Sequence, residues 1–126
     1  MQNLFIKETK YTPKIHLDIE SGIFNVAGKS YPENTFEFYR PVLNWLESYL
    51  ENLKDKELVI NLDLEYLNSS SLKIYFDFLD IIETVNENNT IEINWIYDKE
   101  NDIAEETGED FMSDFSSLSF NLVRRD

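Results

Sequence analysis

Three consecutive hydroxyl side chains, Ser69 to Ser71, follow Asn68 and are the residues of this sequence best suited to a covalent modification. An accessible serine can accept a phosphoryl group, which adds about −1.5 to −2 charges and three strong hydrogen-bond acceptors. A structural role is also open, because Asn and Ser side chains cap helix N-termini by accepting from free N–H groups of the first turn. A cap needs one such side chain, so the others are available to form a phosphorylatable switch.

The serines lie between a strand pattern and a helix pattern. Apolar residues recur at every second position from Leu58 to Tyr66, which is the period of a strand with one buried face. From Leu72 to Val85 they recur at helical spacing. The serines are therefore expected at a helix N-terminus, where free N–H groups and the helix dipole favour an added anion.

No recognisable catalytic arrangement occurs in the sequence. There is no cysteine, and His16, the one histidine, lies on the polar side of a predicted strand without a Ser or Cys partner pattern. Three glycines in the whole chain leave no phosphate-cradling loop, and the 25 acidic residues are scattered. We therefore expect no enzyme activity, no catalytic residue and no cofactor.

An acidic stretch over residues 98–114 is the one candidate for metal binding. Four of its carboxylates have the spacing of calcium-loop positions 1, 3, 5 and 12, but Ile103 stands at position 6, where the loop needs Gly. We expect no metal here, and instead a solvated acidic loop or a short helix.

Composition limits the choice of partners and compartment. The 126 residues, 42% of them hydrophobic, are expected to form one domain over residues 1–126. A net charge of −14 repels nucleic acid and anionic membrane and favours cationic protein surfaces. The chain has no apolar window of about 18 residues and no charged leader, and the lack of cysteine suits a reducing compartment. We expect a soluble, cytoplasmic protein.

Strand and helix patterns alternate along the chain. The expected strands cover residues 4–6, 15–19, 23–27, 58–66, 91–97 and 118–122, and the expected helices run from about 32 to 53 and from about 69 to 86. Strand, helix, strand at these lengths forms a right-handed crossover with parallel strands, and the strands have one apolar and one polar face. The prediction is a two-layer α/β sandwich, with a mixed sheet of about five to six strands and helices mainly on one face.

The first helix has more apolar surface than one sheet-facing side requires. A first apolar row runs from Phe36 to Leu53. A second row consists of Phe38, Val42, Trp45 and Tyr49. The second row is either part of a wide buried face or a partly exposed aromatic patch that a partner covers, with Trp45 as its main contact.

Several stretches together resemble the SiaC family of small bacterial regulatory phosphoproteins, which look like STAS-type anti-sigma-factor antagonists. The matching stretches are Gly28–Asn34, Phe38–Leu46, Leu64–Lys73, Trp95–Tyr97 and Glu106–Phe111. In the family pattern the junction reads Asn-Thr-Ser-Ser-x-Lys with Thr as phosphoacceptor. This chain has Ser69 at that position, which keeps a hydroxyl but adds two identical neighbours.

The resemblance implies a set of site residues. Ser69 is the expected phosphoacceptor, with Ser70 and Ser71 as alternatives. The expected partner-binding residues are Tyr66, Asn68 and Lys73 at the junction, Tyr31 in the first matching stretch, and Trp45. Glu106–Phe111 is expected to form a loop that contacts a partner or flanks the junction.

The resemblance also implies partners. They are a cognate Ser/Thr protein kinase, a PP2C-type phosphatase and a target bound in the unphosphorylated form, typically a diguanylate cyclase in cyclic-di-GMP and biofilm regulation. Asp63 and Glu65 make the junction acidic, so a phosphate there would add like-charge repulsion to an interface. Two alternatives remain at this point: an anti-anti-sigma-type regulator, and a constitutive scaffolding adaptor that binds through the aromatic face of the first helix.

Overall fold

The computed structural model describes all residues from Met1 to Asp126. Its strands are β1 (Leu4–Ile6), β2 (Lys14–Asp18), β3 (Ile23–Ser30), β4 (Glu57–Leu67), β5 (Thr90–Asp98) and β6 (Ser119–Arg125). Its helices are α1 (Thr35–Leu50), α2 (Ser69–Glu83) and α3 (Asp102–Asp114), with a short 3₁₀ turn at Asn86–Asn88.

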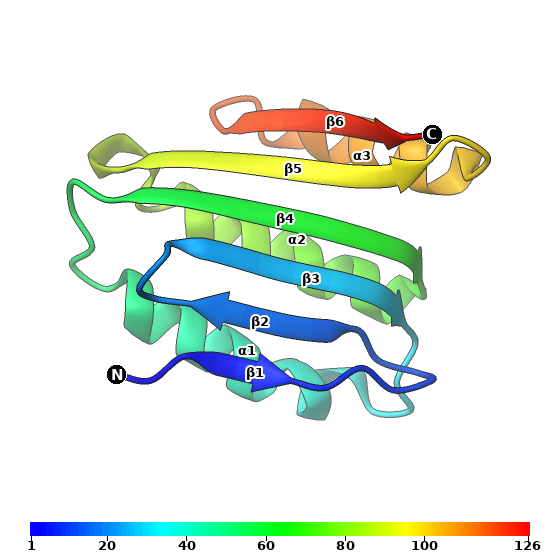
Figure 1. Cartoon of the computed structure of the whole chain (residues 1–126), viewed down its shortest axis with the longest axis horizontal. Helices are drawn as coiled ribbons and strands as arrows, with labels where there is room; N and C mark the ends of the chain where they lie inside the picture. The colour runs from blue at the N-terminus through cyan, green and yellow to red at the C-terminus, as the bar shows by residue number, and fades with distance from the viewer.

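All six strands form one sheet whose spatial order, β1-β2-β3-β4-β5-β6, follows the chain. β1, β2 and β3 pair antiparallel, whereas β3 to β6 pair parallel. The three helices lie behind the same face of this sheet, and the opposite face is uncovered (Figure 1). The predicted two-layer sandwich with a mixed sheet is therefore confirmed.

The parallel half of the sheet sets where the helices begin. α1, α2 and α3 directly follow β3, β4 and β5, which run in the same direction. The carboxyl ends of parallel strands meet at one edge of a sheet, so all three helices start at that edge. The Asn68–Ser71 junction is the start of α2, the middle one of the three helices along this edge.

The core between the sheet and the helices contains 26 buried hydrophobic residues. On α1 the buried residues are Tyr39, Val42, Leu46 and Leu50. Of the two alternatives for the second row, the wide buried face is therefore confirmed, because Val42 is buried and Phe38, Trp45 and Tyr49 are partly buried against the core. Phe36, which leads the first expected row, is 61% exposed.

The acidic stretch forms a helix, one of its two expected forms, but this helix is longer than expected and includes Glu106–Phe111, so the loop expected there was wrong. The helix is the 13-residue α3, which Asn101 caps by accepting from the Ala104 N–H at 3.1 Å. Gly108 is therefore helical, and a Cβ there would lie 2.7 Å from Leu122 Cδ2 and overlap the indole ring of Trp95. The missing side chain lets α3 pack directly on β5. No group of three or more carboxylate or imidazole side chains in the structure converges on a metal position.

Four asparagines form a hydrogen-bonded row across the uncovered face of the sheet. In the strand register Asn25, Asn61, Asn94 and Asn121 lie opposite one another on β3, β4, β5 and β6. Each Nδ2 donates to the Oδ1 of the preceding asparagine, at 3.0, 2.9 and 3.1 Å. We call this row the amide ladder.

Candidate functional site

The junction between β4 and α2 is held by one side chain and one backbone bond. Asn68 is the N-cap of α2, and its Oδ1 accepts from the Ser71 N–H at 2.9 Å. The Asn68 backbone N–H donates to the Ser30 carbonyl at 3.1 Å, which ties the cap to the end of β3. Asn68 therefore fills the cap role, and Ser69 is the first residue of the helix.

The three serines differ in exposure. Ser69 and Ser70 are exposed, whereas Ser71 is 0% exposed. The Ser71 hydroxyl lies 2.7 Å from the Ser30 hydroxyl and is enclosed by the fold. Among the expected phosphoacceptors, Ser71 is thus inaccessible to another protein.

Beneath the junction lies a chain of four buried hydroxyls, which we call the hydroxyl network. Ser30 Oγ bonds both Ser71 Oγ and Tyr39 OH, each at 2.7 Å, and Tyr39 OH bonds Tyr75 OH at 3.0 Å. The chain joins β3, α1 and α2. Burial raises the pKa of Tyr39 and raises that of Tyr75 well above its ordinary value of 10.0, so both phenols stay neutral in the folded protein near neutral pH.

Two grooves open beside the exposed serines. The α2–α3 groove, about 450 Å³, is lined by Ser69, Leu72, Lys73, Phe76, Thr107, Asp110, Phe111 and Asp114. A second groove, lined by Glu33, Asn34, Thr35, Phe36, Ser70, Lys73, Ile74 and Asp77, lies between the start of α1 and α2. Ser69 and Ser70 therefore line different grooves, although they are adjacent in sequence.

The α2–α3 groove presents apolar surface to solvent. Leu72 and Phe76 are 41% and 42% exposed, and the Phe76 ring packs at 5.0 Å from that of Phe115 at the end of α3. Apolar side chains that gather on a surface with charged neighbours are typical of protein-binding sites.

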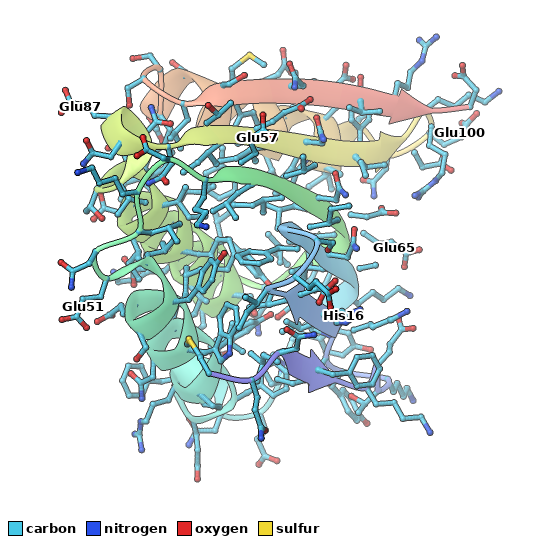
Figure 2. The ribbon with its side chains drawn as sticks, turned by 60° about the vertical axis from the view of Figure 1, so that its left-hand side comes forward. His16, Glu51, Glu57, Glu65, Glu87 and Glu100 are labelled. Carbon is cyan, nitrogen blue, oxygen red and sulfur yellow. The ribbon has the colours of Figure 1, made fainter.

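The charges around this groove come mainly from the helices. Asp110 and Asp114 lie on its α3 side, and Lys73 forms an exposed ion pair with Asp77 at 3.7 Å. Asp63 contributes less than expected, because it pairs with Arg125 on the uncovered face. Glu65 projects from the edge of the sheet at which the helices begin, as does Glu100 (Figure 2).

The tyrosines expected as partner contacts lie beside the junction. Tyr66, near the end of β4, is 50% exposed, and its ring packs edge to face with Tyr31 at 5.8 Å. Tyr31 in turn packs against Tyr11 at 5.3 Å. The structure thus brings Tyr31, Tyr66, Asn68, Ser69 and Lys73 together at one edge of the sheet.

Trp45 lies apart from this cluster. It is about 15 Å along α1 from Thr35, at 1.5 Å per residue. Its ring stacks on Tyr49 and meets Phe24 edge to face, and its Nε1 donates to the Gln2 carbonyl at 2.7 Å. The half-buried Trp45 is therefore engaged within the chain, whereas the exposed aromatic residue of α1 is Phe36.

Ser30, Tyr39 and Tyr75 were not expected at the site. The sequence does contain a signal for them. Ser30 is a polar residue on the same side of its strand as the apolar Phe24 and Val26. Tyr39 and Tyr75 lie on the buried faces of their helices. A buried hydroxyl needs a hydrogen-bond partner. Nothing local indicates that these hydroxyls meet one another.

Fold and junction together define the class of protein. It is a two-layer α/β domain that presents exposed hydroxyls at the start of a helix, beside an apolar groove suited to another protein. A family model described as SiaC family regulatory phosphoprotein matches residues 6–125. The chain belongs to this family of regulatory phosphoproteins, and it is a regulatory protein rather than an enzyme.

Relatives and solved structures agree with this assignment. An uncharacterized protein of Pseudomonas aeruginosa (strain UCBPP-PA14) is 36% identical over 117 residues, 92% of each chain. The crystal structure of apo-SiaC from Pseudomonas aeruginosa superimposes with a TM-score of 0.86, at 34% identity over the full length of both chains. A chain in the crystal structure of the Pseudomonas aeruginosa diguanylate cyclase SiaD in complex with its activator SiaC matches with a TM-score of 0.83 and 34% identity, covering 96% of this chain and 97% of that one.

No helix of this protein combines the length and the apolar character that crossing a membrane requires.

Proposed function

We propose that this protein is a phosphorylation-controlled activator: the unphosphorylated form binds a diguanylate cyclase, and phosphate on Ser69 releases it. The observation that carries the proposal is the position of Ser69, an exposed hydroxyl at the first residue of α2 that also lines the α2–α3 groove. One modification there changes the charge of the groove itself.

Ser69 is favoured over its neighbours by its surroundings. Ser71 is buried, and Ser70 lines the groove on the α1 side. Ser69 alone combines exposure with a place in the α2–α3 groove, beside the exposed Leu72 and Phe76. Modification of Ser69 would therefore act directly on the apolar surface available to a partner.

The cyclase is proposed as partner because SiaC is named as the activator of SiaD in the complex described above, and this chain resembles SiaC over its whole length. Lys73 lines the groove, and Tyr66 and Asn68 closely precede Ser69 at the start of α2, so all three would contact the partner, with Tyr31 packing against the Tyr66 ring. Leu72 and Phe76 would be its apolar centre.

Charge provides the switching mechanism. Asp110 and Asp114 already line the α2–α3 groove, and phosphate on Ser69 would add about −1.5 to −2 charges to the same groove. A partner docking there would meet like-charge repulsion or have to desolvate a dianion. The fold itself would tolerate the phosphate, because the free N–H groups and dipole of a helix N-terminus favour an anion. A Ser/Thr kinase and a PP2C-type phosphatase would set the state of Ser69 in a cytoplasmic setting.

The first test is to map phosphate on the protein purified from its own host, by tandem mass spectrometry with and without phosphatase treatment. We expect a phosphatase-sensitive phosphate on Ser69. Phosphate found at another residue, or none under several growth conditions, would contradict the switch.

The second test measures binding to a purified diguanylate cyclase of the same host by titration calorimetry. We expect Ser69→Asp to weaken binding at least about tenfold through like-charge repulsion, and Ser69→Ala to preserve it. Ser48→Asp, the same change at an exposed position of α1, is the matched control and should bind normally. Phe76→Ala should weaken binding about tenfold by removing an apolar anchor.

The same titration separates the alternatives. In a scaffolding adaptor that binds through α1, Trp45→Ala would abolish binding and Ser69→Asp would leave it unchanged. The contacts of Trp45 with Phe24, Tyr49 and Gln2 count against that outcome. An anti-anti-sigma-type regulator would respond to Ser69→Asp but would bind an anti-sigma factor instead of the cyclase.

A further inference from the structure

We propose that the hydroxyl network selects which serine is modified, by clamping the first turn of α2 so that Ser69 is presented and Ser71 is withheld. Ser71 and Ser30 are then positioning residues, with Tyr39 and Tyr75 as their support. This inference rests on the proposed phosphorylation of Ser69 and concerns how that site is controlled.

The clamp holds both sides of the exposed pair. Before Ser69, Asn68 is fixed by its backbone bond to the Ser30 carbonyl at 3.1 Å. After Ser70, Ser71 is fixed by its N–H bond to Asn68 Oδ1 at 2.9 Å and by its hydroxyl bond to Ser30 Oγ at 2.7 Å. Ser30 therefore holds both anchors, one through its backbone and one through its side chain.

The tyrosines keep Ser30 in place. Tyr39 on α1 bonds Ser30 Oγ at 2.7 Å and Tyr75 on α2 at 3.0 Å. No buried side-chain nitrogen or oxygen in the structure lacks a hydrogen-bond partner, so the network is complete as it stands. Removing one member leaves buried neighbours unsatisfied, which favours local opening of the turn.

Opening the first turn of α2 would change which serine hydroxyls a kinase can reach. The three adjacent serines differ in accessibility, because Ser71 is buried and Ser69 and Ser70 line different grooves. Once the turn opens, Ser71 reaches solvent and the fixed orientation of Ser69 is lost. Loss of the clamp should therefore spread the phosphate over the three serines.

The matched pair for the test is Tyr39→Phe and Tyr49→Phe. Both remove a phenolic hydroxyl from α1, but the structure gives the Tyr39 hydroxyl two hydrogen bonds and the Tyr49 hydroxyl none. Ser30→Ala and Ser48→Ala form a second pair by the same reasoning, since Ser48 is exposed on α1.

Amide hydrogen exchange of the unmodified proteins measures the clamp itself. We expect exchange at Ser71 and Leu72 to rise roughly tenfold in Tyr39→Phe and Ser30→Ala relative to Ile93 in the core of β5, with no such change in either control. An equal rise at Ile93 would show general destabilisation and would overturn the clamp.

Site-resolved mass spectrometry of the same variants, expressed in their own host, measures selectivity. We expect phosphate confined to Ser69 in the wild-type protein and in Tyr49→Phe, and a severalfold larger share on Ser70 and Ser71 in Tyr39→Phe and Ser30→Ala. An unchanged distribution, with wild-type Ser69 phosphorylated, would overturn the selection role alone. Wild-type protein without phosphate on Ser69 would overturn the proposed function and this inference with it.

Discussion

Two networks of four polar side chains lie on opposite faces of the same sheet. The hydroxyl network lies on the covered face, where Ser30, Tyr39, Ser71 and Tyr75 are each at most 1% exposed. The amide ladder lies on the uncovered face, where Asn25 and Asn121 are exposed and Asn61 and Asn94 are half-buried. Both networks join segments that are distant in sequence.

The two networks differ in the free-energy cost of losing one hydrogen bond. Water can replace a lost partner of the amide ladder, so the net contribution of each bond there is small. Water does not reach the hydroxyl network, and a hydroxyl deprived of its partner keeps its full desolvation cost. Removing a single hydroxyl from the covered face should therefore cost stability, which suits the hydroxyl network to positioning a site. The amide ladder on the uncovered face can help to align strands, and losing one of its bonds should cost less.

The largest expected effect comes from Gly108→Ala, which tests the packing of the covered face. Alanine normally stabilises a helix relative to glycine by about 1 kcal/mol. Here the new Cβ would overlap the Trp95 ring and approach Leu122, so we expect the free energy of unfolding to fall by about 2–3 kcal/mol. Urea unfolding measures this, with Glu106→Ala on the exposed side of α3 as a near-neutral control. A stabilised Gly108→Ala would show that α3 can shift away from the sheet.

Tyr75→Phe should have an intermediate effect, because it removes a buried bond and leaves Tyr39 OH one partner fewer. We expect a loss of about 1–2 kcal/mol near neutral pH. The raised pKa of Tyr75 keeps this phenol protonated in the folded state, so its contribution is fully present below pH 10 and is lost as the pH rises above that value.

Unfolding measured as a function of pH therefore gives a second test of Tyr75. The stability of the wild-type protein should fall above about pH 10, and the fall should be shallower in Tyr75→Phe. Equal slopes in the two proteins would contradict the burial of the Tyr75 hydroxyl.

The smallest expected effect comes from Asn61→Ala in the amide ladder. Asn61 and Ser30 each make two side-chain hydrogen bonds within their networks. We expect Asn61→Ala to lower the free energy of unfolding by about 0.5–1 kcal/mol and Ser30→Ala by about twice as much, because water reaches the first site and not the second. Equal losses would break the contrast between the two faces.

The sequence was sufficient to predict the architecture and the junction. The alternation up to Tyr66 and the helical spacing from Leu72 correctly predicted where β4 gives way to α2, and Asn68 is the cap that its side chain suggested. These features are local, since periodicity and capping depend on residues within a few positions of one another. Family motifs extended this to the regulatory class of the protein.

Tertiary structure decided what the local pattern left open. Ser71 differs from Ser69 because it meets Ser30, 41 positions away in the chain, and Trp45 is engaged because the fold brings Gln2, 43 positions away, to its Nε1. Gly108, expected in a loop, lies in α3, where the lack of a side chain lets the helix pack against Trp95. Each outcome depends on burial and on partners that folding brings together from distant positions, which no periodicity or local motif encodes.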